Sequence, residues 1–458
     1  MMRRVVLTVA LLFVAAGCMF AQGGAAGKFA GYWNGVLSVG GQQIKMEFGI
    51  LENGESIVGT MAAQGQKGIP VDVTVKGDSL SLQVKPLNMT YAGVKFGTNV
   101  MGTFSQNGFT TAMMLFPGKI QRNRPQAPKA PYPYIAEEVV FSNETEGSQL
   151  AGTVTYPIGY ENMNPAEVPV VVMVTGSGLQ NRDEEVFDHK PFAVIADWLA
   201  RNGIASLRYD DRGAGKSTGP LETATSKNYA ADASAAVEYV RGLKKFGKVG
   251  ILGHSEGGTI ALMLAGEGIP DFIISMAGVA TQGVECIVWQ NIALLEQQGV
   301  PEQMRRDYGK ALRGIYAQRV KNGGPVADAQ KFVQQICSSE GLKLPPQFVA
   351  NLVSVASLES PWIDFFVAYD PAEAIRKIKC PVMAVNGTLD MQVPAQANLG
   401  VLEKLLPAGG KHLVKEYPQL NHLFQVCTRE NSLQYGEIEQ TIAPQVLEDI
   451  AKWITTLF

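Results

Sequence analysis

Gly253-His254-Ser255-Glu256-Gly257 is the stretch that decides the fold, because an apolar run, Val249 to Leu252, precedes it and a helix-forming run, Thr259 to Ala265, follows it. A strand that turns sharply into a helix needs small residues around the turning residue, which is held in a strained conformation with its side chain outward. The spacing and its flanks therefore predict that Ser255 lies at such a turn and acts as a nucleophile. An ordinary glycine-rich turn is the alternative.

Strand-like and helix-like segments alternate on both sides of this turn. Apolar runs that predict buried parallel strands occur at Val170 to Val174, Ile204 to Tyr209, Val249 to Leu252, Phe272 to Met276 and Val382 to Val385. Helical patterns between them cover Pro191 to Ala200, Tyr229 to Leu243 and Thr259 to Ala265. This alternation predicts an α/β domain over residues 135–458.

The segment from about 284 to 369 interrupts the alternation. It is mostly helical in pattern, most clearly at Glu302 to Val320 and Val326 to Ser338. Because it follows one core strand and precedes the next, it is predicted to form a helical cap over the carboxyl edge of the sheet.

Residues 28–117 follow a different pattern, with a period of two. Apolar Ile44, Met46, Phe48 and Ile50 alternate with more polar neighbours, which predicts a small antiparallel β-domain. Trp33 and Phe48 of this domain are expected in its core, with a ligand pocket as the alternative. The proline-rich residues 118–134 are predicted to form a linker.

The first residues predict export. Arg3 and Arg4 precede a short apolar run and then small residues, as in a signal peptide over residues 1–21 that is cleaved after Ala21. The alternative is a lipoprotein signal that ends before Cys18, whose lipid would be the only membrane tether. The protein is then expected to be periplasmic or secreted.

Composition excludes several classes of partner. The chain has 458 residues, a formal net charge of -3 and a pI near 5.9, which offer no basic surface for nucleic acid. Cys286, Cys337, Cys380 and Cys427 are widely spaced and show no metal-ligand pattern. They are expected to be buried free thiols, with one disulfide as the alternative, and neither a metal nor a cofactor is predicted.

A nucleophilic serine needs a neighbouring base, and that base needs an anionic partner. His422 is predicted to be the base, because it lies on a loop between a strand-like segment and the last helix. Asp390 is predicted to be the acid, at the carboxyl end of a strand, and Asp364 and Asp370 are rivals expected to be solvated. The side chain of His254 is expected to point away from Ser255.

The reaction also needs hydrogen-bond donors for an oxyanion. The backbone N–H groups of Glu256 and Ser177 are assigned this role, the second within Thr175-Gly176-Ser177-Gly178. The sequence Gly213-Ala214-Gly215-Lys216-Ser217 is similar to the end of a phosphate-binding loop. It fails that motif, since position 210 is Asp where a glycine is required.

Together these residues resemble the serine α/β-hydrolases of the monoglyceride-lipase and serine-aminopeptidase branch, and with the β-domain the chain resembles the EstD-type bacterial esterases. The segments that carry the resemblance are Thr175 to Gly178, Asn181 to Asp183, Arg208 to Gly213 and Gly253 to Gly257, with Asp390 and His422. Thr175 departs from the pattern, since many members of the wider branch have His there. The resemblance implies an α/β-hydrolase core with a helical cap.

The expected function is an exported serine carboxylesterase that hydrolyses small-molecule esters through an acyl-enzyme. Two alternatives stay open at this point. One is a serine peptidase, since the same catalytic set cleaves amides. The other is a non-catalytic protein on a hydrolase scaffold that binds a glycan or lipid.

Overall fold

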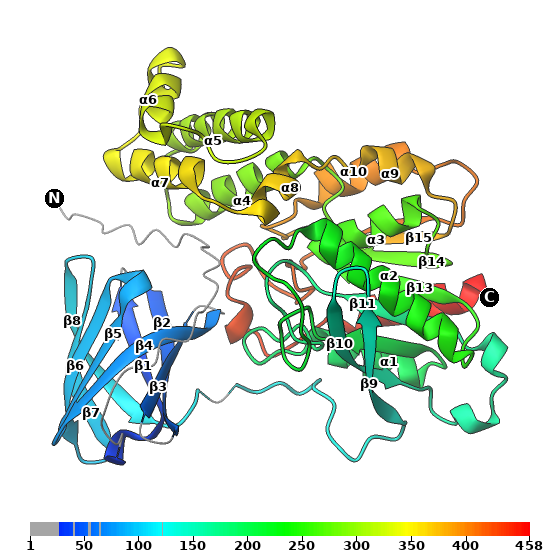
Figure 1. The fold of residues 1–458 in the computed structure, drawn as a ribbon, viewed down its shortest axis with the longest axis horizontal. Coiled ribbons are helices and arrows are strands. Elements are labelled where there is room, and N and C mark those ends of the chain that lie inside the picture. Colours follow the sequence, from blue (N-terminus) through cyan, green and yellow to red (C-terminus); the bar gives the residue numbers. More distant parts are fainter. Residues whose placement is uncertain (1–26, 40–41, 54–55, 64–65, 121) are drawn as a thin grey trace. The chain divides into compact units, whose positions relative to one another are not determined.

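The computed structural model describes residues 27–39, 42–53, 56–63, 66–120 and 122–458. The chain divides into two compact units, Met1–Asn123 and Arg124–Phe458, which are drawn in Figure 1. The predicted signal segment 1–21, with Cys18, lies outside the described residues. Within the part of the chain that is described, no helix is both long and apolar enough to cross a membrane.

The division falls inside the segment 118–134 that the sequence predicts as a linker. The Arg124 guanidinium donates hydrogen bonds to the carbonyls of Phe187 and Gly436, both at 2.8 Å. The Gln126 side chain also bonds to the backbone of the second unit. The residues just after the division are thus held on the second unit by polar side chains.

The first unit is a closed antiparallel barrel of eight strands in sequential order, with β8 paired to β1. The strands are β1 (Gly31–Val39), β2 (Gln42–Asn53), β3 (Ser56–Ala63), β4 (Gln66–Lys76), β5 (Ser79–Val84), β6 (Met89–Phe96), β7 (Asn99–Gln106) and β8 (Phe109–Pro117). Short 3₁₀ turns lie at Gly27–Phe29 and Lys85–Leu87. The predicted antiparallel β-domain is therefore confirmed, and closure of the sheet removes its exposed edges.

Alternating side chains fill the barrel, as the period of two requires. In β5, Leu80, Leu82 and Val84 are buried while their neighbours are exposed. Trp33 and Phe48 are also buried in this core, and the Trp33 indole donates to the Phe29 carbonyl. Both aromatics lie in the packed interior, as expected from the sequence.

The second unit is built on an eight-stranded sheet in the order β16-β15-β14-β13-β11-β12-β10-β9. Its strands are β9 (Ala136–Asn143), β10 (Ser148–Thr155), β11 (Val170–Val174), β12 (Ala205–Tyr209), β13 (Val249–His254), β14 (Phe272–Met276), β15 (Val382–Gly387) and β16 (Leu413–Tyr417). Strands β11 to β16 are parallel, and β9 and β10 form an antiparallel hairpin at the edge. The five predicted apolar strands are all present.

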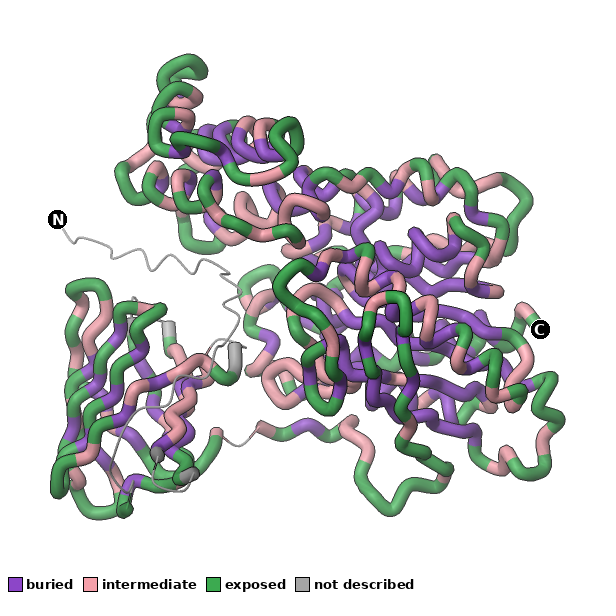
Figure 2. The backbone as a smooth tube through the Cα atoms, in the orientation of Figure 1, coloured by how far each residue is buried: buried purple, intermediate pink, exposed green. Residues whose placement is uncertain are grey.

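Helices cover both faces of this sheet. Helices α1 (Pro191–Arg201) and α11 (Pro444–Leu457) pack on one face, and α2 (Ser226–Leu243), α3 (Glu256–Gly266), α9 (Ala372–Lys377) and α10 (Ala395–Leu405) on the other. Figure 2 shows the central strands buried between these layers. This three-layer arrangement is an α/β-hydrolase core, with β13 in the middle of the sheet.

Between β14 and β15 the chain forms a separate helical layer, the cap (Figure 1). It consists of α4 (Gly283–Gln297), α5 (Glu302–Asn322), α6 (Ala329–Ser339), α7 (Pro346–Ser357) and α8 (Pro361–Ala368), which share their own apolar core. The predicted cap is thus present as a helical insertion. It contacts the sheet domain through α8, which lies close to α2.

One expectation about the cap is wrong, namely that Asp364 is solvated. Asp364 is not solvated, because its carboxylate pairs at 2.7 Å with the fully buried Arg319, which also donates to backbone carbonyls of α7. This pairing fixes α8 against α5 and α7. Asp370 is exposed, as expected.

Candidate active site

Ser255 lies where β13 ends and α3 begins, with φ 55° and ψ -119°. A non-glycine residue at positive φ is strained and persists only when its surroundings hold it. Here the Ser255 N–H donates to the Met276 carbonyl on β14 at 2.9 Å. The half-buried side chain therefore projects from the carboxyl edge of the sheet.

The glycines around Ser255 are required by close packing. A Cβ atom on Gly253 would lie 1.9 Å from the Gly257 carbonyl oxygen, and one on Gly257 would lie 2.0 Å from that of Val174. Neither backbone atom can move without displacing a strand or the helix. The Gly-x-Ser-x-Gly pattern thus forms the sharp strand-to-helix turn that the sequence predicts.

Asp390 and His422 lie on the loops after two neighbouring strands. Asp390 follows β15 and His422 follows β16, and Oδ2 of the carboxylate is 2.8 Å from Nδ1 of the imidazole. The other carboxylate oxygen accepts the N–H groups of Gln392 and Val393. Both side chains are buried, so the carboxylate holds the ring with Nε2 free to act as an acceptor.

The segments that carry Ser255 and His422 meet through His254. The ring of His254, the residue before Ser255, lies 4.8 Å from the ring of His422 between centroids. Its Nε2 is 2.9 Å from the His422 carbonyl oxygen. The segments of the predicted nucleophile and the predicted base are therefore joined.

The loop after β11 carries the proposed oxyanion donor Ser177. The Gly176 N–H is occupied by Glu184 Oε1 at 2.7 Å, and a Cβ on Gly176 would lie 3.1 Å from Ser255 Cβ. Ser177 follows Gly176 in this loop, and Glu256 follows Ser255 at the start of α3. Their N–H groups are the predicted oxyanion donors.

The Glu256 side chain is buried behind the site. It accepts hydrogen bonds from Ser226 Oγ at 2.6 Å and from the Trp362 indole at 2.9 Å, and it also bonds to the Ser177 side chain. Burial raises the pKa of Glu256, although these donors act in the opposite direction. The carboxyl group thus links the oxyanion loop to α2 and to cap helix α8.

Acidic residues of the segment Arg208 to Gly213 hold the oxyanion loop in place. Asp211 accepts from Thr175 Oγ1 at 2.8 Å, so the residue that departs from the family pattern has a structural bond of its own. Asp210 pairs with Arg182 at 2.9 Å and accepts the Lys216 N–H. The segment similar to a phosphate-binding loop is therefore wrapped around a carboxylate, which disfavours a phosphate there.

Sequence reasoning missed Glu184 and the contacts of His254. The ring of His254, expected to point away from Ser255, bonds to Glu184 and contacts His422. Glu184 is separated from His254 by 70 residues, so no local pattern indicates the pair. The acidic run that follows Asn181 to Asp183 was the only available signal.

The remaining potential ligands do not form a second centre. His189 is fully buried and bonds to Thr441 and to the Tyr435 carbonyl. The cysteines 286, 337, 380 and 427 are free thiols. Within the described ranges, no group of three His, Cys, Asp or Glu side chains is placed to hold a metal ion.

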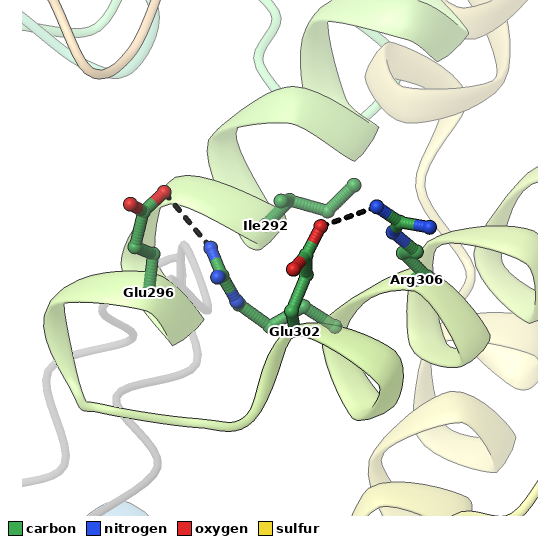
Figure 3. Close-up of a pocket in the computed structure, with 5 residues that line it drawn as sticks. Ile292, Glu296, Glu302 and Arg306 are labelled. Atoms are coloured by element: carbon green, nitrogen blue, oxygen red, sulfur yellow. Dashed lines mark hydrogen bonds and ion pairs between the residues drawn. The ribbon is translucent and has the colours of Figure 1, made fainter.

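Cap residues line at least two cavities of the described structure. One, of about 330 Å³, is lined by Ile292, Glu296, Glu302, Arg305 and Arg306, and Figure 3 shows its carboxylates paired with its guanidinium groups. The other, of about 500 Å³, lies between α4 and the start of α10 and is lined by Trp289, Ile292, Ala293, Glu296, Pro394, Gln396 and Ala397. Neither cavity is lined by a residue of the predicted catalytic set, and the second includes Pro394 from the segment that follows Asp390.

The chain is similar to several known proteins. The chain is 24% identical over 341 residues to Esterase EstD of Thermotoga maritima, with 72% of each chain covered. Among solved structures it is similar to Est1E from Butyrivibrio proteoclasticus with bound ferulic acid (19% identity, 69% of this chain and 98% of that chain, TM-score 0.40). It is also similar to the Pyrococcus furiosus esterase Pf2001 (14% identity, 74% and 99%, TM-score 0.41).

The family match covers the sheet domain from β10 to β16, with the cap included. Residues 146–416 match the X-Pro dipeptidyl-peptidase family, the S15 family. This range contains Ser255, Asp390 and the loop after β11, and it spans more than half of the chain. The chain therefore belongs to the X-Pro dipeptidyl-peptidase (S15) family and is a serine hydrolase of the α/β-hydrolase fold.

Proposed function

We propose that the protein is a carboxylesterase that hydrolyses small-molecule esters through an acyl-enzyme on Ser255. The observation that carries this proposal is the 2.8 Å contact between Asp390 and His422, held beside a serine in a strained strand-to-helix turn. A buried carboxylate on Nδ1 leaves Nε2 as the basic nitrogen and stabilises the imidazolium that forms.

In the first half of the reaction, Ser255 Oγ bonds to the ester carbonyl carbon while its proton passes to Nε2 of His422. The N–H groups of Ser177 and Glu256 stabilise the resulting oxyanion. The carbon–oxygen bond to the alcohol then breaks, and the alcohol leaves with the proton from His422. Water, activated by the same nitrogen, releases the acid and restores Ser255.

The cavity of about 500 Å³ supports an apolar ester as substrate. Trp289 of the cap and Pro394 line it, and it follows closely on the loop that carries Asp390. Apolar walls with few polar groups are typical of small-molecule sites. Replacing Trp289 by Ala is expected to raise KM for long acyl chains more than for acetate.

The direct test is turnover of p-nitrophenyl esters by the wild type and by Ser255→Ala. Without the nucleophile, kcat is expected to fall by roughly 10⁶-fold. Ala retains the Cβ atom at this strained position, so circular dichroism and the unfolding temperature should be unchanged. Substantial turnover by a folded Ser255→Ala protein would refute the proposal.

A second candidate, a peptidase, is favoured by the family match over residues 146–416. The same nucleophile and base cleave amides, and the distinction lies in groups that bind the substrate amine. A panel of p-nitrophenyl esters, aminoacyl amides and X-Pro p-nitroanilides separates the two. The esterase proposal requires kcat/KM for the best ester to exceed that for every amide.

Export is part of this proposal and rests on residues 1–21. In a bacterial host, the full-length chain is expected to lose this segment and begin at Gln22, or to begin at a lipid-modified Cys18. Fractionation followed by intact mass measurement distinguishes these forms. Recovery of an unprocessed chain from the cytoplasm would contradict export.

A further inference from the structure

A second carboxylate–imidazole pair lies beside Asp390 and His422. Glu184 Oε1 is 3.0 Å from His254 Nδ1, and the rings of His254 and His422 are 4.8 Å apart between centroids. Glu184 is 4% exposed and His254 7%. The reaction steps above use neither side chain, so the cost of burying a second ionisable pair needs its own explanation.

Both ring nitrogens of His254 face acceptors. Nδ1 faces the Glu184 carboxylate, and Nε2 is 2.9 Å from the His422 carbonyl oxygen. A neutral imidazole has one N–H, so with Glu184 ionised only the imidazolium satisfies both contacts. A proton resident on Glu184 would preserve both contacts too, and in either case the pair is neutral overall.

The direction of the pKa shift of His254 agrees with a protonated pair. Burial disfavours the charged form of His254, but the charge and hydrogen bond of Glu184, with the His422 carbonyl, raise its pKa above the usual range. Asp390 also faces His254 and acts in the same direction. Burial raises the pKa of Asp211 well above its usual range, which favours its neutral form beside Glu184.

The pair holds two segments that must meet at Ser255. Glu184 Oε1 accepts the Gly176 N–H at 2.7 Å, which fixes the peptide just before the donor Ser177. His254 holds the backbone of His422 through its carbonyl. Glu184 itself has φ 51°, and its Oε2 is buried without a hydrogen-bond partner among the described residues. Such local costs are typical of functional positions.

We propose that Glu184 and His254 are positioning residues that share one proton and align the oxyanion loop with the loop of the base. The inference rests on the proposed function, since it concerns the same site. Loss of the shared proton leaves one N–H for two acceptors, and one of the two segments is then released.

This predicts a specific pH dependence. As pH rises through the raised pKa of His254, the pair loses its proton and kcat falls. The alkaline limb of the profile belongs to His254. In Glu184→Gln the negative charge is gone, so the alkaline limb is expected to move down by about one pH unit or more.

The experiment compares wild type, Glu184→Gln, His254→Gln and the double variant. Measurements are kcat and KM for a p-nitrophenyl ester and the rate of inactivation by a fluorophosphonate, each as a function of pH. Misalignment of the site is expected to lower kcat in each single variant by roughly 100-fold with little change in KM. Because the two residues act as one unit, the double variant should lose little more than a single variant.

Asp232→Asn is the matched control. Asp232 forms a buried ion pair with Arg212, with 2.7 Å between the carboxylate oxygen and the guanidinium nitrogen, and takes no part in the reaction steps above. This variant is expected to lose stability and retain the wild-type pH profile. Unfolding temperatures identify any variant that fails to fold, and the wild-type profile needs no variant.

Three results would overturn the inference. One is a wild-type profile without an alkaline limb above about pH 7. Another is a folded Glu184→Gln protein with the wild-type limb and a kcat within about twofold of the wild type. A wild-type protein that neither turns over esters nor reacts with the fluorophosphonate would overturn the proposed function as well, and so is distinguishable from the other two.

Discussion

The barrel interior and the carboxyl edge of the sheet differ in the side chains that they bury: apolar ones in the barrel, many ionisable ones at the edge. Among the described residues 27–120, the buried side chains are apolar, apart from the hydroxyl of Tyr91 and the indole nitrogen of Trp33, which donate to backbone carbonyls. The ionisable side chains buried at the edge of the sheet include Glu184, Asp211, His254, Glu256, Asp390 and His422.

Burial of ionisable groups costs free energy unless each is paired and hydrogen-bonded. The barrel avoids this cost, because its described interior is packed with apolar side chains. At the edge of the sheet, the buried pairs hold the segments of the predicted nucleophile, base and oxyanion donors. The proposed function therefore predicts that substitutions at the edge change activity far more than stability.

Among the variants that compare the edge with the barrel, Asp390→Asn is expected to have the largest effect. The substitution retains the shape of the side chain but removes the charge that stabilises the His422 imidazolium, so kcat should fall by roughly 10⁴-fold. Tyr91→Phe is the matched barrel variant, because it removes a buried hydroxyl that donates to Val100. It is expected to cost about 1 kcal/mol of stability and no activity. Equal losses of activity in the two variants would break the comparison.

Gly257→Ala is expected to have the next largest effect. The new Cβ would lie 2.0 Å from the Val174 carbonyl oxygen, so β11 and α3 must separate and carry Ser255 with them. We expect a loss of about 1 to 3 kcal/mol in unfolding free energy and roughly 100-fold in kcat. Urea unfolding and steady-state kinetics measure the two effects.

Gly400→Ala serves as the control for this substitution. Gly400 lies in α10, where a Cβ would meet nothing within 4 Å. It should be neutral or stabilising by up to about 1 kcal/mol. If Gly257→Ala behaves in the same way, the turn at Ser255 is not held as tightly as the structure indicates.

The smallest expected effect is the pH dependence of stability caused by His189. Burial, followed by the charge of Arg124, lowers the pKa of His189 to about 4. In the unfolded chain, His189 therefore binds a proton near pH 6.5, whereas in the folded chain it binds this proton only near pH 4. The unfolding free energy should fall between about pH 6.5 and pH 4, by at most roughly 3 kcal/mol.

Urea titrations across this range, with His189→Gln as the reference, measure this contribution. The described barrel has no histidine, so the decline should belong to the unit Arg124–Phe458. If the unfolding free energies of the wild type and His189→Gln change equally between pH 6.5 and pH 4, the assignment to His189 is wrong.

Much of the architecture was predictable because it depends on local patterns. The apolar runs predicted β11 to β15, and the period of two predicted the barrel strands. The edge strand β9 was not singled out, since five of its eight residues are exposed and it has no apolar run like those of the central strands. Closure of the barrel depends on the pairing of β1 with β8, which no local pattern indicates.

The candidate site likewise has features that local sequence predicts and features that only the fold creates. The turn at Ser255 depends on neighbouring residues, and the chain order of Ser255, Asp390 and His422 gave the rest of the predicted set. The contacts of His254 join residues 70 and 168 positions away, and they depend on side-chain geometry that forms only in the folded core. The ion pair of Asp364 was missed for the same reason.

Trapping the acyl-enzyme tests the central claim most directly. The protein is mixed with a p-nitrophenyl ester, quenched in acid within the first turnover and measured by intact mass and peptide mapping. The account predicts one acyl group per chain, on the peptide that contains Ser255, and none in Ser255→Ala. Ester turnover with no adduct at Ser255, or with the acyl group on another residue, would contradict it.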